Sequence, residues 1–294
     1  MDNLSILSNL WDDEIDSVDC DTLRKSLNRV HRSAVLKWLF ESLELLHIED
    51  RVFFTTAMLA DRFCAHAVSN NRPLEGSELQ LVILASLCCS LKTVECTLDL
   101  PIREFLEHVS GGHVEPRTIF QKETEILQAL NWNVITQSLC VFIDSFYYAL
   151  TFNSTTSPTL EQACVQSPMP QWALKQSNLA RFLLFLSVFD TDWLHSRKPS
   201  VLAAACILTS AYTLLEHEHN ISMDNVGTIL IHSKWIEKDD DLDFLVAETI
   251  HYWHRSLSND AIAGILALYQ TSEKNNVAQI RPPRLISRLS SSGA

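Results

Sequence analysis

Three short clusters of histidine or acidic residues have the composition that metal binding or proton transfer requires. They are residues 217–219 (His-Glu-His), the pair His251 and His254, and residues 239–241 (Asp-Asp-Asp). Histidines two positions apart do not share a helix face. His251 and His254 can share one, but no carboxylate or cysteine pattern accompanies them, and HExxH is absent. We therefore expect no metal site, a solvated helix end at 217–219 and an exposed loop or helix start at 239–241.

The motifs of nucleotide-binding and nucleophilic enzymes are also missing. The chain has only 6 glycines in 294 residues, against about 7% in an average protein, and contains neither GxxxxGK[ST] nor GxGxxG. No GxSxG elbow occurs, and no catalytic carboxylate pair stands out among 36 acidic residues. The sequence predicts a protein that is not an enzyme and needs no cofactor.

Charge and cysteine usage narrow the partners and the setting. With 23 Lys and Arg against 36 Asp and Glu the net charge is −13, which repels phosphate backbones, so we expect no direct nucleic-acid binding. The 8 cysteines form no CxxC pair and the acidic N-terminus is unlike a signal peptide, which favours a nuclear or cytoplasmic protein. The longest uncharged apolar stretches, 79–90 and 201–215, fall short of the ~18–20 residues of a membrane span.

The elements that position any site are predicted to be helices. Apolar residues recur at spacings of three and four through long tracts without proline, which is the pattern of amphipathic helices. The helix predicted at 77–91 is apolar almost all round, as expected of a helix buried on every side. The first half predicts five helices, at residues 32–47, 50–67, 77–91, 102–109 and 116–132.

The second half repeats this organisation. Helices are predicted at 139–151, 172–189 and 199–215, with two shorter segments ending near Trp253 and a polar spacer at 153–171. The small-residue helix at 199–215 is third in its series, like 77–91. We predict an all-α fold of tandem five-helix units. Its parts are a flank (1–30), a first unit (31–135), a second unit (136–256, with a loop insertion at about 153–171), and a C-terminal helix with a flexible tail (257–294).

Five positions in the first unit match, in order, the cyclin box. Their contexts are HRSAVLKWLFE, LADRF, ELQLV, SLKTVE and KETEILQALNW, and the matching residues are Arg32, Asp61, Leu81, Lys92 and Glu123. In the second unit, KPSVLAAACI resembles the third helix of the C-terminal cyclin repeat. Over about residues 30–255 the chain resembles an atypical member of the cyclin family with two cyclin boxes.

The resemblance implies a kinase-binding surface. In cyclins, the residues that match Lys92 and Glu123 contact the kinase backbone, and Glu95, Leu127 and Trp132 would extend the same face. Solvated surface charges are the alternative for the first two, and core positions are the alternative for Leu127 and Trp132. Arg32 and Asp61 match a buried ion pair that joins the first two helices, and Leu81 matches a core position.

A second surface implied by the resemblance is a docking patch for substrates that carry Arg-x-Leu. The residues at its positions are Val35, Trp38, Glu41, Leu79 and Gln80. His31, Ala34 and Val35 stand where docking cyclins carry Met, Ile or Val, and Leu, which makes the pocket shallower and more polar. An ordinary amphipathic helix face is the alternative.

Two functions follow from the resemblance. The first is a regulatory subunit that binds and activates a cyclin-dependent protein kinase, forming a heterodimer that controls cell-cycle or related nuclear events. The second is a cyclin-fold scaffold in a nuclear complex of transcription or meiotic recombination, without kinase activation. Thr93 and Val94 favour this alternative because they replace an aromatic residue and a glutamate that are usual after the lysine in cell-cycle cyclins.

Overall fold

The computed structural model describes residues 21–23, 29–72, 74, 76–94, 98, 100–134, 138–153, 169–214, 223–238 and 240–283. Throughout these ranges the regular elements are helices, and no β-strand occurs. The predicted all-α fold is confirmed. None of the described helices is both long enough and apolar enough to cross a bilayer.

The first unit packs four helices around a central one. Its members are α3 (Arg29–Leu45), α4 (Asp50–Ser69), α5 (Gly76–Thr93), α6 (Ile102–Val109) and α7 (Pro116–Ala129). The central helix is α5, which contacts the other four. Helix α6 is followed by Gly111 and Gly112, whose φ angles of 62° and 73° are accessible to glycine at little cost. Pro116 then starts α7, at a position where its missing N–H is not needed.

The second unit repeats the plan around α11 (Pro199–Leu214). Most side chains of α11 are small, and almost all are buried. Four helices pack around it: α8 (Leu139–Asn153), α9 (Gln171–Val188), α12 (Met223–His232) and α13 (Leu242–Ser256). One short helix, α10 (Thr191–Leu194), was not predicted. The Asp190 side chain caps it by accepting hydrogen bonds from the N–H groups of Asp192 and Trp193.

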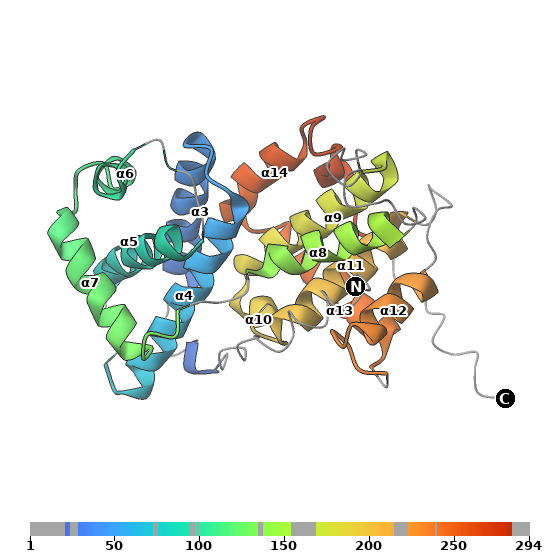
Figure 1. Ribbon diagram of the computed structural model, residues 1–294, viewed down its shortest axis with the longest axis horizontal. Coiled ribbons are helices and arrows are strands. Elements are labelled where there is room, and N and C mark those ends of the chain that lie inside the picture. The colour runs from blue at the N-terminus through green and yellow to red at the C-terminus, as the bar shows by residue number, and fades with distance from the viewer. Residues whose placement is uncertain are drawn as a thin grey trace, which may run out of the picture.

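The C-terminal part of the described chain returns to the first unit. After η1 (Asp260–Ile262), helix α14 (Ala263–Tyr269) contacts both α3 and α9, and η2 (Val277–Gln279) contacts α9. In Figure 1, α14 lies above the junction between α3 and α9. A Cβ atom on Gly264 would lie 3.4 Å from the Phe40 ring, at ordinary van der Waals distance, so α14 lies close to α3 at this point. Residues 284–294 lie outside the described ranges.

An aromatic cluster joins the two units into one continuous core. Phe40 of α3 and Phe53 of α4 meet Phe185 of α9, with ring centroids 5.5 Å and 5.6 Å away. Tyr269 of α14 also packs against Phe185, with ring centroids 5.9 Å apart. Rings at these distances bury large apolar areas, so the relative position of the units is fixed by packing.

Candidate partner-binding surface

Lys92 and Glu123, predicted to share one surface, form an ion pair between α5 and α7. The Lys92 Nζ donates to Oε1 and Oε2 of Glu123 at 2.6 Å and 2.8 Å. The Lys92 side chain is 44% exposed, whereas that of Glu123 is 9% exposed. Neither residue is therefore an isolated solvated charge. The buried Glu123 carboxylate holds the Lys92 ammonium in place, and that ammonium remains accessible to solvent.

The surroundings of Lys92 keep it charged. Burial alone would lower the pKa of Lys92, but the hydrogen bonds with Glu123 outweigh this effect and raise the pKa. The ammonium lies 5.5 Å from the centroid of the Phe120 ring, close enough for a cation–π contact. Phe120 was not picked out from the sequence, although it lies one helical turn before Glu123 and so shares its face.

Two adjacent residues of α7 form ion pairs with opposite ends of α5. Glu123 pairs with Lys92 in the last turn of α5, and Lys122 donates to Glu78 in its first turn, at 2.6 Å. An acidic residue at the start of a helix and a basic residue at its end both suit the helix dipole. The crossing of α5 and α7 is therefore held by charge at both ends.

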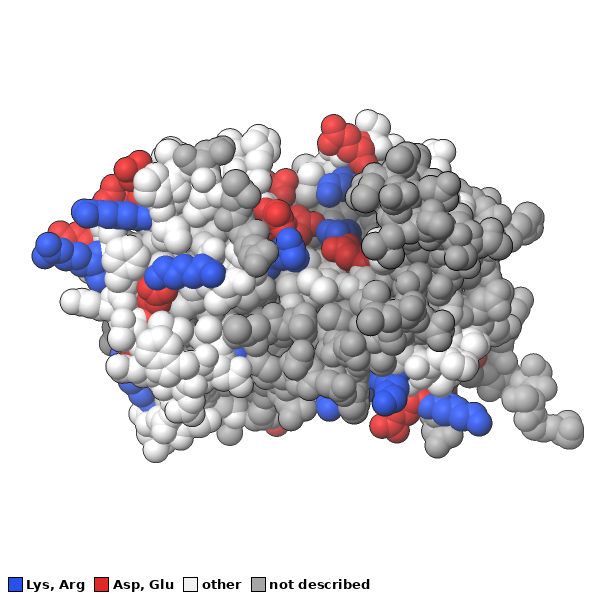
Figure 2. Space-filling view, viewed as in Figure 1, with Lys and Arg blue, Asp and Glu red and all other residues white. Residues whose placement is uncertain are grey.

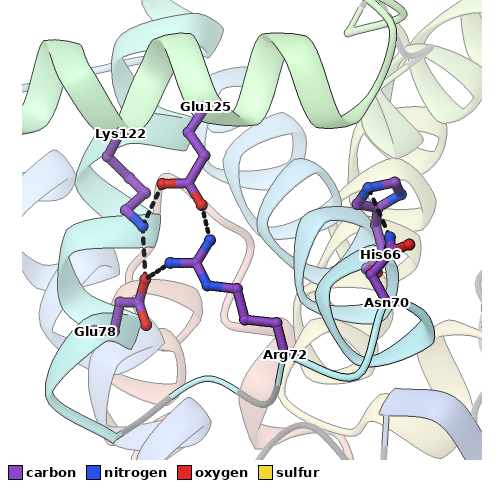
Figure 3. A network of polar contacts seen from close by, with 6 residues as sticks. All are labelled: His66, Asn70, Arg72, Glu78, Lys122 and Glu125. Atoms are coloured by element: carbon purple, nitrogen blue, oxygen red, sulfur yellow. Dashed lines mark hydrogen bonds and ion pairs between the residues drawn. The ribbon is translucent and has the colours of Figure 1, made fainter.

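The pair at the start of α5 belongs to a four-residue network, drawn in Figure 3. Lys122 also donates to Glu125, at 2.7 Å, and Arg72 bridges Glu125 and Glu78. Burial would raise the pKa of Glu125, but the hydrogen bonds from Lys122 and Arg72 lower it. Because Arg72 follows α4, the network ties the segment between α4 and α5 to α7.

Trp132 lies just beyond the end of α7 and is 66% exposed. The helix, predicted to reach Trp132, ends at Ala129 because Asn131 and Trp132 adopt left-handed φ angles of 51° and 61°. This conformation costs about 1–2 kcal/mol for a residue with a side chain. The Trp132 N–H donates to the carbonyl of Leu127 at 2.7 Å, so the two residues adjoin. The alternative of a core position is wrong for Trp132, whereas Leu127 packs partly against the core.

The other residue predicted for this surface, Glu95, lies outside the described ranges. Lys92, Phe120, Glu123, Leu127 and Trp132 are called the α5–α7 surface below. In the view of Figure 2, lysines and arginines of the described chain lie beside acidic side chains, without forming a continuous basic area.

The residues predicted as a docking patch differ in accessibility. Glu41 is exposed, and Val35, Trp38 and Gln80 are half-buried. Leu79 is buried in the core and offers no surface to a peptide. Helix α14 passes beside this patch, since a Cβ on Gly264 would lie 3.6 Å from Cγ of Glu41. Peptide binding at this patch stays a prediction.

The predicted ion pair of Arg32 and Asp61 is confirmed, and it extends into the second unit. Arg32 donates to both Asp61 oxygens, at 2.9 Å and 2.6 Å, and to the carbonyl of Val188 at 2.6 Å. His195, which the sequence did not single out, lies 2.9 Å from Asp61 through its Nε2. The Arg32, Asp61 and His195 side chains are at most 3% exposed. This inter-unit cluster connects α3 and α4 to the residues that end α9 and α10.

The charge state of Asp61 depends on its partners. Burial alone would raise the pKa of its carboxyl group, but the charge of Arg32 and the hydrogen bonds from His195 and Arg32 lower it to about 2. Asp61 is therefore ionised at neutral pH.

The histidine and acidic clusters fall only partly within the part of the chain that is described. No group of three or more potential ligands occurs there, and His251 and His254 are both exposed. Asp241 caps α13 by accepting a hydrogen bond from the Phe244 N–H, which confirms the predicted helix start. Residues 217–219 and Asp239 lie outside the described ranges.

The chain matches known protein families over most of its length. Residues 5–135 match the cyclin N-terminal domain, and residues 159–283 match the cyclin C-terminal domain. Cyclin-D3-1 of Oryza sativa subsp. japonica is 28% identical over 188 residues, covering 64% of this chain and 48% of the relative. The G2/mitotic-specific cyclin-2 of Medicago sativa is 24% identical over 193 residues, covering 66% of this chain and 50% of the relative. The chain thus spans about half the length of these relatives.

A solved structure has the same fold. The viral cyclin from herpesvirus saimiri superposes with a TM-score of 0.57 at 15% identity, covering 87% of this chain and 96% of the viral protein. At that identity the likeness concerns the fold alone.

Proposed function

Because this chain belongs to the cyclin family, we propose that it is a regulatory subunit that binds and activates a cyclin-dependent protein kinase through the α5–α7 surface. The role requires no reaction by the chain itself, since ATP and magnesium belong to the kinase. The proposal places the protein in the nucleus or the cytoplasm, where such kinases act.

The observation that carries the proposal is the exposed, left-handed Trp132. A large aromatic side chain that is 66% exposed leaves much apolar area in water, and its backbone adds strain. Both costs are removed or offset if a partner covers the ring. Tryptophan is also among the residues that most often dominate the energy of protein interfaces.

Lys92 and Glu123 add a charged contact to the apolar contact made by Trp132. The exposed Lys92 can donate to a backbone carbonyl of the kinase while Glu123 holds its position, and such charge-assisted bonds are worth about 1.5–3 kcal/mol. Leu127, between Glu123 and Trp132, adds apolar area. The surface therefore combines one oriented cation with an adjoining apolar edge.

The test is affinity purification of the tagged protein from its own cells, read by mass spectrometry and by a kinase assay on the eluate. Wild type is compared with Trp132→Ala and with the double variant Lys92→Ala/Glu123→Ala. Phe244→Ala serves as the matched control, because Phe244 is a 53% exposed aromatic residue of the second unit.

We expect a cyclin-dependent kinase with the wild type and the control, and about 30-fold less with Trp132→Ala, the effect of losing an interface residue worth about 2 kcal/mol. Equal recovery with every variant would show that the kinase binds another surface. Absence of any kinase, with other proteins equally enriched throughout, would overturn the proposal in favour of the scaffold.

A further inference from the structure

Arg62 of α4 reaches across to the segment that carries Trp132. Its Nη2 donates to the backbone carbonyl of Asn133 at 2.8 Å, although the two residues are 71 positions apart in the chain. Its neighbour Asp61 faces the other unit, in the inter-unit cluster. Arg62 therefore belongs to the first unit's own surface and connects α4 to the end of α7.

Apart from this contact, the buried part of the Arg62 guanidinium has few polar partners. Its Nη1 atom is buried and has no hydrogen-bond partner. Among the residues that the structure describes, no charged partner offsets the burial that lowers the pKa of Arg62. An unpaired polar group that is removed from water is destabilising, so Arg62 is not explained as a stabilising residue.

The segment that Arg62 holds is the strained one. Asn131 and Trp132 are both left-handed, and the next residue, Asn133, supplies the carbonyl that Arg62 binds. Val134 is buried and anchors the other end of the segment. Backbone hydrogen bonds from Trp132 to Leu127 and from Asn133 to Leu130 hold this turn against α7, and Arg62 adds a bond from another helix through Asn133.

We propose that Arg62 is a positioning residue that fixes Trp132 in the orientation in which it meets a partner protein. The inference rests on the proposed function for the identity of that partner, but not for the positioning itself. It predicts that Arg62 favours binding while contributing little or nothing to the stability of the free protein.

The first experiment uses the free protein. Backbone amide exchange is compared between wild type and Arg62→Met, which keeps an apolar stem and removes the donor and the charge. We expect the amides of residues 132–134 to exchange at least tenfold faster, while those of α4 and the middle of α7 keep their rates. Arg103→Met is the matched control, since Arg103 is an exposed arginine of the same unit. Unchanged exchange at 132–134 would overturn the inference, with or without a known partner.

The second experiment measures binding to the kinase recovered with the wild type, in a double-mutant cycle. We expect Arg62→Met to weaken binding 5- to 30-fold with a melting temperature equal to or above that of the wild type, and Arg62→Lys to recover part of the loss. In the Trp132→Ala background, Arg62→Met should cause no further loss.

The outcomes separate this inference from the proposed function. Weak binding by Trp132→Ala but normal binding by Arg62→Met overturns the inference alone. The same loss from Arg62→Met in both backgrounds also overturns it, because Arg62 would then act independently of Trp132. Normal binding by Trp132→Ala overturns the proposed surface, and the exchange experiment still decides whether Arg62 positions the segment.

Discussion

The inter-unit cluster and the Lys92–Glu123 pair both join helices through one carboxylate and one cationic side chain, but they differ in their access to water. In the cluster, both charged side chains are 3% exposed, and His195 and Val188 supply further hydrogen bonds. In the pair, the carboxylate is largely buried while Lys92 is 44% exposed. One charge of the pair remains within reach of a partner.

The difference shows that a carboxylate paired with a cationic side chain can have either a structural role or a binding role, depending on its exposure to water. A buried charge that loses its partner cannot be solvated, so each member of the cluster depends on the others and the arrangement is structural. An exposed lysine that loses its partner is solvated at once. Glu123 is largely buried and needs its partner, so Lys92 can be shared with another protein at small cost only while it keeps its bond to Glu123.

The largest expected effect comes from breaking the inter-unit cluster. Asp61→Asn should lower the free energy of unfolding by about 3–5 kcal/mol at pH 7, because it leaves the Arg32 charge buried and unpaired. Urea unfolding measures this. The double variant Arg32→Met/Asp61→Leu, which removes both charges, should cost less than Asp61→Asn alone. A decrease in the free energy of unfolding below about 1 kcal/mol for Asp61→Asn would show that water solvates the Arg32 guanidinium in the variant.

The second effect concerns pH. The folded pKa of Asp61, about 2, lies below its ordinary value of about 3.9, so its stabilising contribution is complete above about pH 4 and is lost as the pH falls towards 2. The gap in unfolding free energy between wild type and Asp61→Asn should narrow by about 2 kcal/mol over that range. Unfolding curves at several pH values give this gap, and a constant gap would contradict the assigned pKa.

The smallest effect is expected at the Lys92–Glu123 pair. Glu123→Gln should change the free energy of unfolding by at most about 1 kcal/mol, because water and the retained amide both solvate the exposed Lys92. The same denaturation experiment applies. A loss of about 3 kcal/mol or more would place this pair beside the inter-unit cluster as a structural device and would remove the distinction drawn above.

Much of the helical pattern was readable from the sequence. The predicted helices at 50–67, 102–109 and 139–151 agree with α4, α6 and α8 to within two residues at either end. Periodicity and proline positions are local signals, and the buried face of each helix repeats them turn after turn. The confirmed pairing of Arg32 with Asp61 came from the resemblance to cyclins, since spacing alone does not pair residues on different helices.

Other features could not be predicted from the residues near them in the sequence. Helix α7 was predicted to reach Trp132, because nothing in the letters Leu-Asn-Trp-Asn shows that residues 131 and 132 turn left-handed. The short α10 was missed because four residues carry no periodic pattern. Leu79 was assigned to a surface patch although it packs into the core, since a leucine at a helix start fits either environment.

By itself the sequence determined the helical class, the repeated organisation and the cyclin resemblance, because these depend on residues close together in the chain. Only the tertiary structure decided that Glu123 is buried while Lys92 is exposed, that Arg62 holds the Trp132 segment, and that His195 completes the cluster around Asp61, 134 positions away. These are contacts between helices. The pattern of a single helix indicates which face is buried, and the packing of the whole chain decides what that face meets.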